Sequence, residues 1–143
     1  MRILLILGIF LMITIAISCA SQNTTSSAGK DTQLYFGSGG GFSGISKDFR
    51  LSANGTMQQK PSITSAWGDI GKVPQATTDQ LFSQVQQLGI SELQHDYPSN
   101  RYYYIETKGD APNKVMWGNP DHPPADEIKI LHSILMKLTT RKK

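Results

Sequence analysis

The histidines are the residues whose chemistry would be most useful to an enzyme. The sequence has three of them, His95, His122 and His132. In the adjacent pairs His95-Asp96 and Asp121-His122 a carboxylate could orient an imidazole for acid–base work, although neighbours in sequence rarely reach that geometry. None of the three has metal-ligand spacing to another His, Cys or Glu. We therefore expect no metal, no cofactor and no enzymatic activity, and the alternative is a small periplasmic hydrolase that uses His95 or His122.

A glycine-rich stretch, GSGGGFSG, contains a spacing that could hold a phosphate group. Gly39, Gly41 and Gly44 match the pattern G-x-G-x-x-G of dinucleotide-binding loops. Such a loop needs a helix directly after it, because the helix amides bind the pyrophosphate. Here an alternating apolar run follows at residues 49–53, which predicts a strand. We therefore interpret the glycines as a turn or bulge between two strands, where glycine allows positive φ values.

Aromatic side chains are the candidates for a binding surface. Phe42 stands between glycines, where nothing nearby in sequence covers it, so it could contact a partner protein. In the run RYYYIETK, Tyr103 and Ile105 point to one face of a strand, and Tyr102 and Tyr104 point to the other. If Ile105 faces the helices, Tyr102 and Tyr104 lie on the open face and could bind a protein or a glycan. The alternatives are core packing of Phe42 and cross-strand packing of the tyrosines.

The single cysteine, Cys19, follows a segment that resembles a secretory signal. Arg2 precedes an apolar run over residues 3–17, and a polar stretch follows the cysteine. A bilayer-spanning helix needs about 20 apolar residues, and this run is shorter. An uncleaved anchor is one alternative, and cleavage after Ala20 to release a soluble protein is another. A lone cysteine at the end of a signal is easier to explain as a lipid attachment point than as half of a disulfide.

The segment Ala16-Ile17-Ser18-Cys19 resembles the bacterial lipobox. The usual leucine is replaced by Ala16. The resemblance implies that the Cys19 thiol receives a diacylglyceryl group and becomes the new N-terminus after cleavage. Since Ala20 and not aspartate follows, it also implies the outer membrane of a Gram-negative cell envelope, as in other small lipoproteins of that class. The expected partners are the membrane, through lipidated Cys19, and an unknown protein or glycan.

The charge balance argues against nucleic acid as a partner. Loss of residues 1–18 removes Arg2 and leaves 13 Lys and Arg against 11 Asp and Glu, a net charge of +2. Nucleic-acid binding needs a clustered basic face. The one cluster, residues 141–143, follows a predicted helix, whose dipole it suits.

The predicted strands come in pairs. Asn54-Gly55 between runs at 49–53 and 56–59 predicts a hairpin with a type I′ turn, in which both central residues have positive φ. A strand is also expected at Leu34–Phe36, and a further extended piece at 63–67. In the second half, RYYYIETK and residues 114–117 predict another antiparallel pair.

Two amphipathic helices are expected after these pairs. Thr77 could cap the first helix, which ends at Gly89 with Ile90 placed for the apolar contact of a Schellman motif. The second helix begins near Ala125, with Asp126 in its first turn.

These elements predict an α+β fold of order ββ-α-ββ-α. An antiparallel sheet of four or five strands would carry two helices on one face. Residues 33–143 would form a single domain, behind a signal peptide at 1–18 and a flexible tether at 19–32.

A shift of 50 residues hints at an internal duplication. It places Trp67-Gly68 on Trp117-Gly118 and Pro74 on Pro124. A duplicated strand–strand–helix unit would explain this match, and coincidence is the alternative. In either case both tryptophans are expected at strand ends, packed against the helix that follows.

Overall fold

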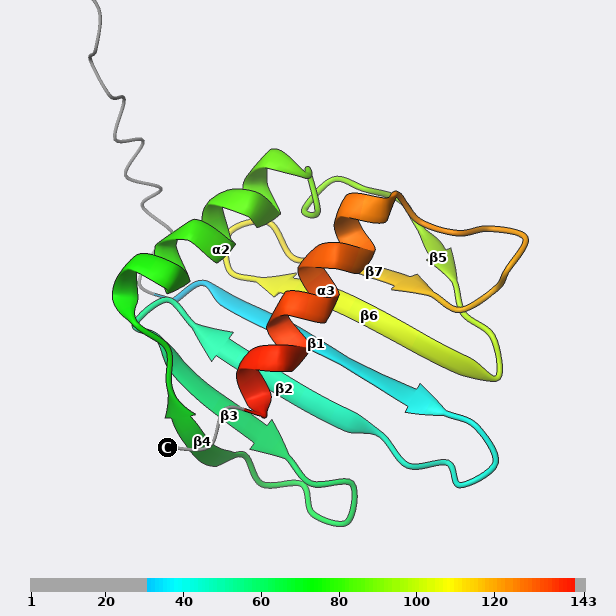
Figure 1. The fold of residues 1–143 in the computed structure, drawn as a ribbon, viewed down its shortest axis with the longest axis horizontal. Helices are drawn as coiled ribbons and strands as arrows, with labels where there is room; N and C mark the ends of the chain where they lie inside the picture. The colour runs from blue at the N-terminus through cyan, green and yellow to red at the C-terminus, as the bar shows by residue number, and fades with distance from the viewer. Residues whose placement is uncertain (1–30, 141–143) are drawn as a thin grey trace, which may run out of the picture.

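A computed structural model describes residues 31–140 of the chain. This part has an α+β fold with a seven-stranded mixed sheet, whose spatial order is β4-β3-β2-β1-β6-β7-β5. In chain order the elements are β1 (Gln33–Gly40), β2 (Lys47–Ser52), β3 (Thr56–Lys60), β4 (Gly68–Lys72), α2 (Gln75–Gln87), β5 (Asp96–Tyr97), β6 (Arg101–Lys108), β7 (Asn113–Trp117) and α3 (Asp126–Thr139). Both helices lie on the same face of the sheet (Figure 1).

The sheet differs from the expectation in strand count, in direction and in element order, since four strands precede α2 and three lie between α2 and α3, in place of two and two. The predicted four or five antiparallel strands are seven, and β5 pairs with β7 in parallel while every other pair is antiparallel. The extended piece expected at 63–67 is replaced by β4 further on, where Gly68 and Gly71 weaken any strand signal. β5 has only two residues, too few to show an alternating pattern.

One hydrophobic core lies between the helices and the sheet. Alternate residues of the central strands point into it, as the period-two pattern predicts. The fully buried side chains of this core are Leu34, Phe36, Leu51, Ile90, Ile105, Val115, Leu131 and Leu135. The opposite face of the sheet, which no helix covers, is called the open face below.

The helix ends confirm the Schellman motif and correct the N-terminal cap. Gly89 has φ +61°, the Ile90 amide donates to Val85 O at 3.2 Å, and the Ile90 side chain is fully buried. At the other end Pro74 is the cap of α2, so the predicted cap at Thr77 is wrong. Proline suits this position because its missing N–H needs no partner there.

The first hairpin forms where the sequence predicts it, but with a different turn. Only Gly55 has a positive φ, so the type I′ expectation is wrong for Asn54. The Asn54 side chain instead accepts a hydrogen bond from the Thr56 amide at 2.9 Å. This side-chain bond to the backbone two residues further on stabilises the turn.

The two matched tryptophans lie on opposite faces of the sheet. Trp117 is buried under α3, where its ring lies 5.2 Å from that of His132. Trp67 lies on the open face, with its ring 5.5 Å from Tyr35. The expectation that Trp67 packs against the helix that follows is therefore wrong. Its ring contacts Tyr35 on the face of the sheet that the helices do not cover.

His132 joins α3 to the central strand. Its Nε2 lies 2.9 Å from the carbonyl oxygen of Gly37, and the ring is buried between Tyr103 and Trp117. The carbonyl can only accept, so the neutral ring donates from Nε2. Burial lowers the pKa of His132 below its ordinary value of 6.5, and the bond to Gly37 opposes this only in part.

We expect the protein to lose stability in mild acid because of His132. The unfolded chain binds a proton near pH 6.5, whereas the folded ring resists it, so the free energy of unfolding falls as pH drops below 6.5. The measurement is urea denaturation between pH 7.5 and 4.5. His132→Gln removes the titrating ring and should flatten this dependence; an unchanged slope in the variant would contradict the assignment.

Candidate functional site

The glycine-rich stretch divides between strand and turn: residues 37–40 continue β1 beyond the expected Leu34–Phe36, and the turn to β2 occupies residues 41–46. Pairing of β1 with β2 stops at Ser38 opposite Lys47, while pairing with β6 continues to Gly40 opposite Arg101. Gly40 and Gly41 have φ near +80°, and the Gly41 amide donates to Asn100 O at 2.7 Å. Because β2 and not a helix follows directly, the structure has the turn expected from the sequence and not a dinucleotide-binding loop.

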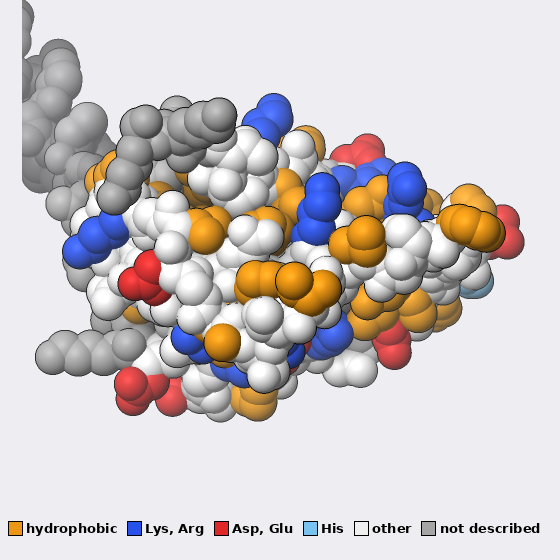
Figure 2. Space-filling view, turned by 90° about the horizontal axis from the view of Figure 1, so that it is seen from below, with side chains coloured by type: hydrophobic (Ala, Val, Ile, Leu, Met, Phe, Trp, Pro, Cys, Tyr) orange, Lys and Arg blue, Asp and Glu red, His pale blue; other side chains and the backbone are white. Residues whose placement is uncertain are grey.

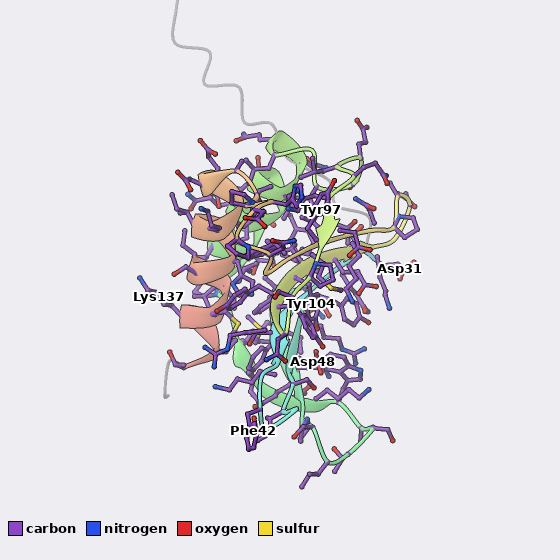
Figure 3. All side chains as sticks on the ribbon, turned by 90° about the vertical axis from the view of Figure 1, so that its right-hand side faces the viewer. Asp31, Phe42, Asp48, Tyr97, Tyr104 and Lys137 are labelled. Atoms are coloured by element: carbon purple, nitrogen blue, oxygen red, sulfur yellow. The ribbon has the colours of Figure 1, made fainter. Side chains whose placement is uncertain are left out.

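Phe42 projects from this turn into solvent. Its side chain is 111% exposed relative to a reference phenylalanine, so the alternative of core packing is wrong. Ile45, in the same turn, is 56% exposed. Figure 3 shows Phe42 toward the lower end of the molecule, far from Tyr97 at the upper end. The turn therefore presents two apolar side chains that the domain does not use for packing.

A cavity of about 380 Å³ lies at the base of the turn. Two cations, two serines, two glycines, one aliphatic residue and one tyrosine line it: Lys47, Arg101, Ser38, Ser43, Gly39, Gly40, Ile45 and Tyr103. None of these residues is acidic. Its volume is in the range of small-molecule sites, about 300–1,000 Å³.

The two cations of the cavity have no partner within residues 31–140. The ion pairs of this part of the chain are Lys108 with Glu106 and Lys129 with Asp126, and neither Lys47 nor Arg101 makes a side-chain hydrogen bond there. A methyl group at Gly41 would lie 4.0 Å from Nη2 of Arg101, so the guanidinium group sits beside the turn. The charges are therefore available to a ligand.

Asp48 is the nearest acidic neighbour in sequence, and its carboxylate is already bound. It accepts hydrogen bonds from the Tyr104 hydroxyl at 2.6 Å and from the Ser46 hydroxyl at 2.7 Å. Figure 3 shows Asp48 and Tyr104 close together, apart from Phe42. Asp48 alternates with Lys47 along β2, so its side chain points to the other face of the sheet and does not enter the cavity.

The tyrosines of β6 occupy space that glycines leave open. Tyr104 lies opposite Gly37 and Tyr102 opposite Gly39. A methyl group at Gly39 would lie 2.5 Å from the Tyr102 hydroxyl, and one at Gly37 would lie 3.1 Å from the Tyr104 ring. The aromatic rings thus cover the glycines across the strand pair, a known way to stabilise glycine in a sheet.

The expectation that Tyr104 is an exposed contact is wrong. Its side chain is buried, and Nζ of Lys114 lies 4.5 Å from the ring centroid. Burial, followed by the hydrogen bond to the Asp48 carboxylate, raises the pKa of Tyr104 far above its usual range. Tyr102 is half-buried. Cross-strand packing, the alternative considered for both residues, describes their contacts better than an exposed pair does.

Removal of the Tyr104 hydroxyl should cost stability. Tyr104→Phe leaves Asp48 with one side-chain donor and should lower the free energy of unfolding by about 1–2 kcal/mol. Tyr102→Phe is the matched control, because the Tyr102 hydroxyl makes no hydrogen bond within the described part of the chain. Its effect should stay within about 0.5 kcal/mol. Equal losses in the two variants, measured by urea denaturation, would contradict this assignment.

Elsewhere on the open face, side chains of neighbouring strands contact one another. Arg50 hydrogen-bonds Gln58, whose amide donates to Asp69 at 2.5 Å, and Cζ of Arg50 lies 4.7 Å from the centroid of Trp67. The sequence reasoning missed this network, because it depends on the register of β2, β3 and β4. Figure 2 looks at the lower edge of the view of Figure 1 and not at the open face, and on that edge apolar side chains lie in separate patches among polar and basic ones.

The histidines proposed for the hydrolase meet at Tyr97. The ring of His122 stacks on Tyr97 at 4.3 Å, and the ring of His95 meets it edge-on at 5.0 Å. His95 Nε2 is buried and has no hydrogen-bond partner within residues 31–140. Neither histidine lines the turn cavity. Within residues 31–140 there is no group of three His, Cys, Asp or Glu side chains placed to hold a metal ion. Both imidazole rings pack on Tyr97, and neither histidine makes an ion pair with a carboxylate within residues 31–140.

The predicted signal peptide, Cys19 and most of the predicted tether lie outside the described residues. Within residues 31–140 neither helix is long and apolar enough to cross a membrane. No protein-family model matches the sequence, and no curated protein matches it.

Proposed function

We propose that the protein is a lipid-anchored envelope protein that acts as a binding or accessory module. Acylation of Cys19 holds it on the outer membrane, and the tether over residues 19–32 carries the folded domain. The contact region is the surface formed by Phe42, Ile45, Lys47 and Arg101, called the turn surface below. The partner is a protein or a glycan of the envelope.

The complete exposure of Phe42 is the observation that carries this proposal. An exposed aromatic ring contributes nothing to the core, and aromatic residues are enriched among the anchors of binding interfaces. The neighbouring Lys47 and Arg101 have no ion pairs in residues 31–140 that would neutralise them. An apolar anchor beside available charge is a typical arrangement for a contact site with a polar rim.

The position of the turn also suits a tethered module. β1 begins next to the tether and has eight residues, so the turn lies about 25 Å from the tether's point of attachment. In Figure 1 β1 runs from one side of the domain to the turn at the other. The turn surface is thus at the end of the strand that is remote from the tether and is free to meet a partner.

Photo-crosslinking from position 42 in the full-length protein tests this function. A benzophenone-bearing phenylalanine analogue replaces Phe42 in intact cells, and the same analogue at Ile63 is the control, since Ile63 is 91% exposed in a different turn. We expect covalent adducts to an envelope component from position 42 and about tenfold fewer from position 63. Equal labelling from both positions, or none from position 42, would refute the proposed contact.

A further inference from the structure

The turn cavity brings together two cations and two hydroxyl groups from separated parts of the chain. Ser38 comes from β1, Ser43 from the turn, Lys47 from β2 and Arg101 from β6. The register of the sheet sets Ser38 opposite Lys47, and Gly40 opposite Arg101. The four donors therefore surround one space, and their neighbours on the wall include no carboxylate that would compete for them.

Gly39 and Gly40 contribute backbone and no side chain to the wall of this space. Pairing of β1 with β2 ends at Ser38, so Gly39 and Gly40 have no strand partner on the β2 side. A side chain at Gly39 or Gly40 would also collide with neighbouring groups, since a methyl group there would lie 2.5 Å from the Tyr102 hydroxyl or 2.0 Å from Asn100 O. Contacts outside the cavity therefore require glycine at both positions, and because β2 follows the turn, no helix supplies the amides of a dinucleotide loop.

We propose that the turn cavity binds a phosphate group carried by the envelope partner. The inference rests on the proposed function, because it names the chemistry that the turn surface recognises. A guanidinium group and an ammonium group with two hydroxyl donors suit the several oxygens and the charge of a phosphate. A carboxylate carries a single charge and two oxygens, so it matches two cations and two hydroxyl donors less well than a phosphate does. Phe42 and Ile45 then contact the apolar part of the same partner.

The partner that fits this chemistry is a phosphorylated glycan, and a phospholipid head group is the other source of the same phosphate that the test distinguishes. The test titrates the full-length lipidated protein, in neutral detergent micelles at constant ionic strength, and follows amide chemical shifts by NMR. The probes are inorganic phosphate, glycerol 3-phosphate, glucose 1-phosphate and acetate. We expect saturable shifts in the turn for the three phosphates and weaker binding of acetate. Tighter binding of glycerol 3-phosphate identifies the head group, and tighter binding of glucose 1-phosphate identifies the sugar.

Two double variants distinguish a specific phosphate site from a general effect of the protein's positive charge. Lys47→Gln with Arg101→Gln should weaken phosphate binding by about tenfold or more, because both charge-assisted hydrogen bonds are lost. Lys72→Gln with Lys137→Gln removes the same charge from exposed positions outside the cavity and should change binding less than about twofold. All four side chains are exposed, so neither double variant should lower the thermal unfolding midpoint.

Several results would overturn the inference. These are an equal loss in both double variants, acetate binding as tight as phosphate, or no saturable shift in the turn. Failure here is distinguishable from failure of the proposed function. Crosslinks from position 42 without phosphate binding would support the contact module and refute the phosphate site. Phosphate binding without crosslinks would support the phosphate site and refute the contact with a partner at position 42.

Discussion

Gly37→Ala should unfold the domain or lower its free energy of unfolding by about 3 kcal/mol or more. Gly37 lies in the central strand β1, where an added methyl group would sit 2.1 Å from the carbonyl oxygen of Lys47. The colliding atom belongs to the backbone of the paired strand and cannot rotate away. The same residue accepts the hydrogen bond from His132, so a shift of β1 also disturbs α3. Urea denaturation followed by circular dichroism measures the loss.

Gly68→Ala is the control for this substitution. Gly68 lies in the edge strand β4, where an added methyl group would meet only Gln59 O at 4.0 Å. We expect a change within about 0.5 kcal/mol. If Gly37→Ala were tolerated as well as Gly68→Ala, the packing of β1 between β2 and β6 described above would be wrong.

Cys19→Ser should release the protein from the membrane. Each buried methylene of an acyl chain contributes about 0.8 kcal/mol, so loss of the chains should lower partitioning into a membrane fraction on the order of a hundredfold or more. The N-terminal peptide of the mature protein should lose the mass of its lipid at the same time. Mass spectrometry and membrane fractionation measure the two effects.

Ser21→Ala is the control for Cys19→Ser, because it changes a nearby polar residue and keeps the thiol. It should retain both the lipid mass and the membrane partitioning of the wild-type protein. A wild-type chain already cut after Ala20, with no lipid at its N-terminus, would contradict the anchor and support release of a soluble protein.

Local signals in the sequence predicted the elements whose stability is local. The hairpin at Asn54-Gly55, though not its type I′ turn, the Schellman motif at Gly89 and the strand propensity of the aromatic run in β6 could each be read from neighbouring residues. β4 and β5 escaped prediction because they exist through pairing with β3 and β7, and not through their own propensity. The number of strands and the parallel pairing of β5 with β7 could therefore be established only from the structure.

The candidate site was predictable only in part. The isolation of Phe42 among glycines indicated an exposed ring, and the structure places it in solvent. Lys47 and Arg101 gave no signal, because they are far apart in sequence and come together through the pairing of β1 with both neighbours. The alternation along β6 predicted the face of Tyr104 correctly but not its burial, since the glycine opposite it leaves a space that the ring occupies.

Amide hydrogen exchange in isolated envelopes is the most direct test of where the protein makes contact. The lipidated full-length protein is compared in its native membrane and after purification in neutral detergent. We predict slower exchange over residues 39–47 in the native membrane, with residues 61–66 and the strands of the open face unchanged. Unaltered exchange over residues 39–47, or protection confined to the open face, would show that the turn surface is not the contact site.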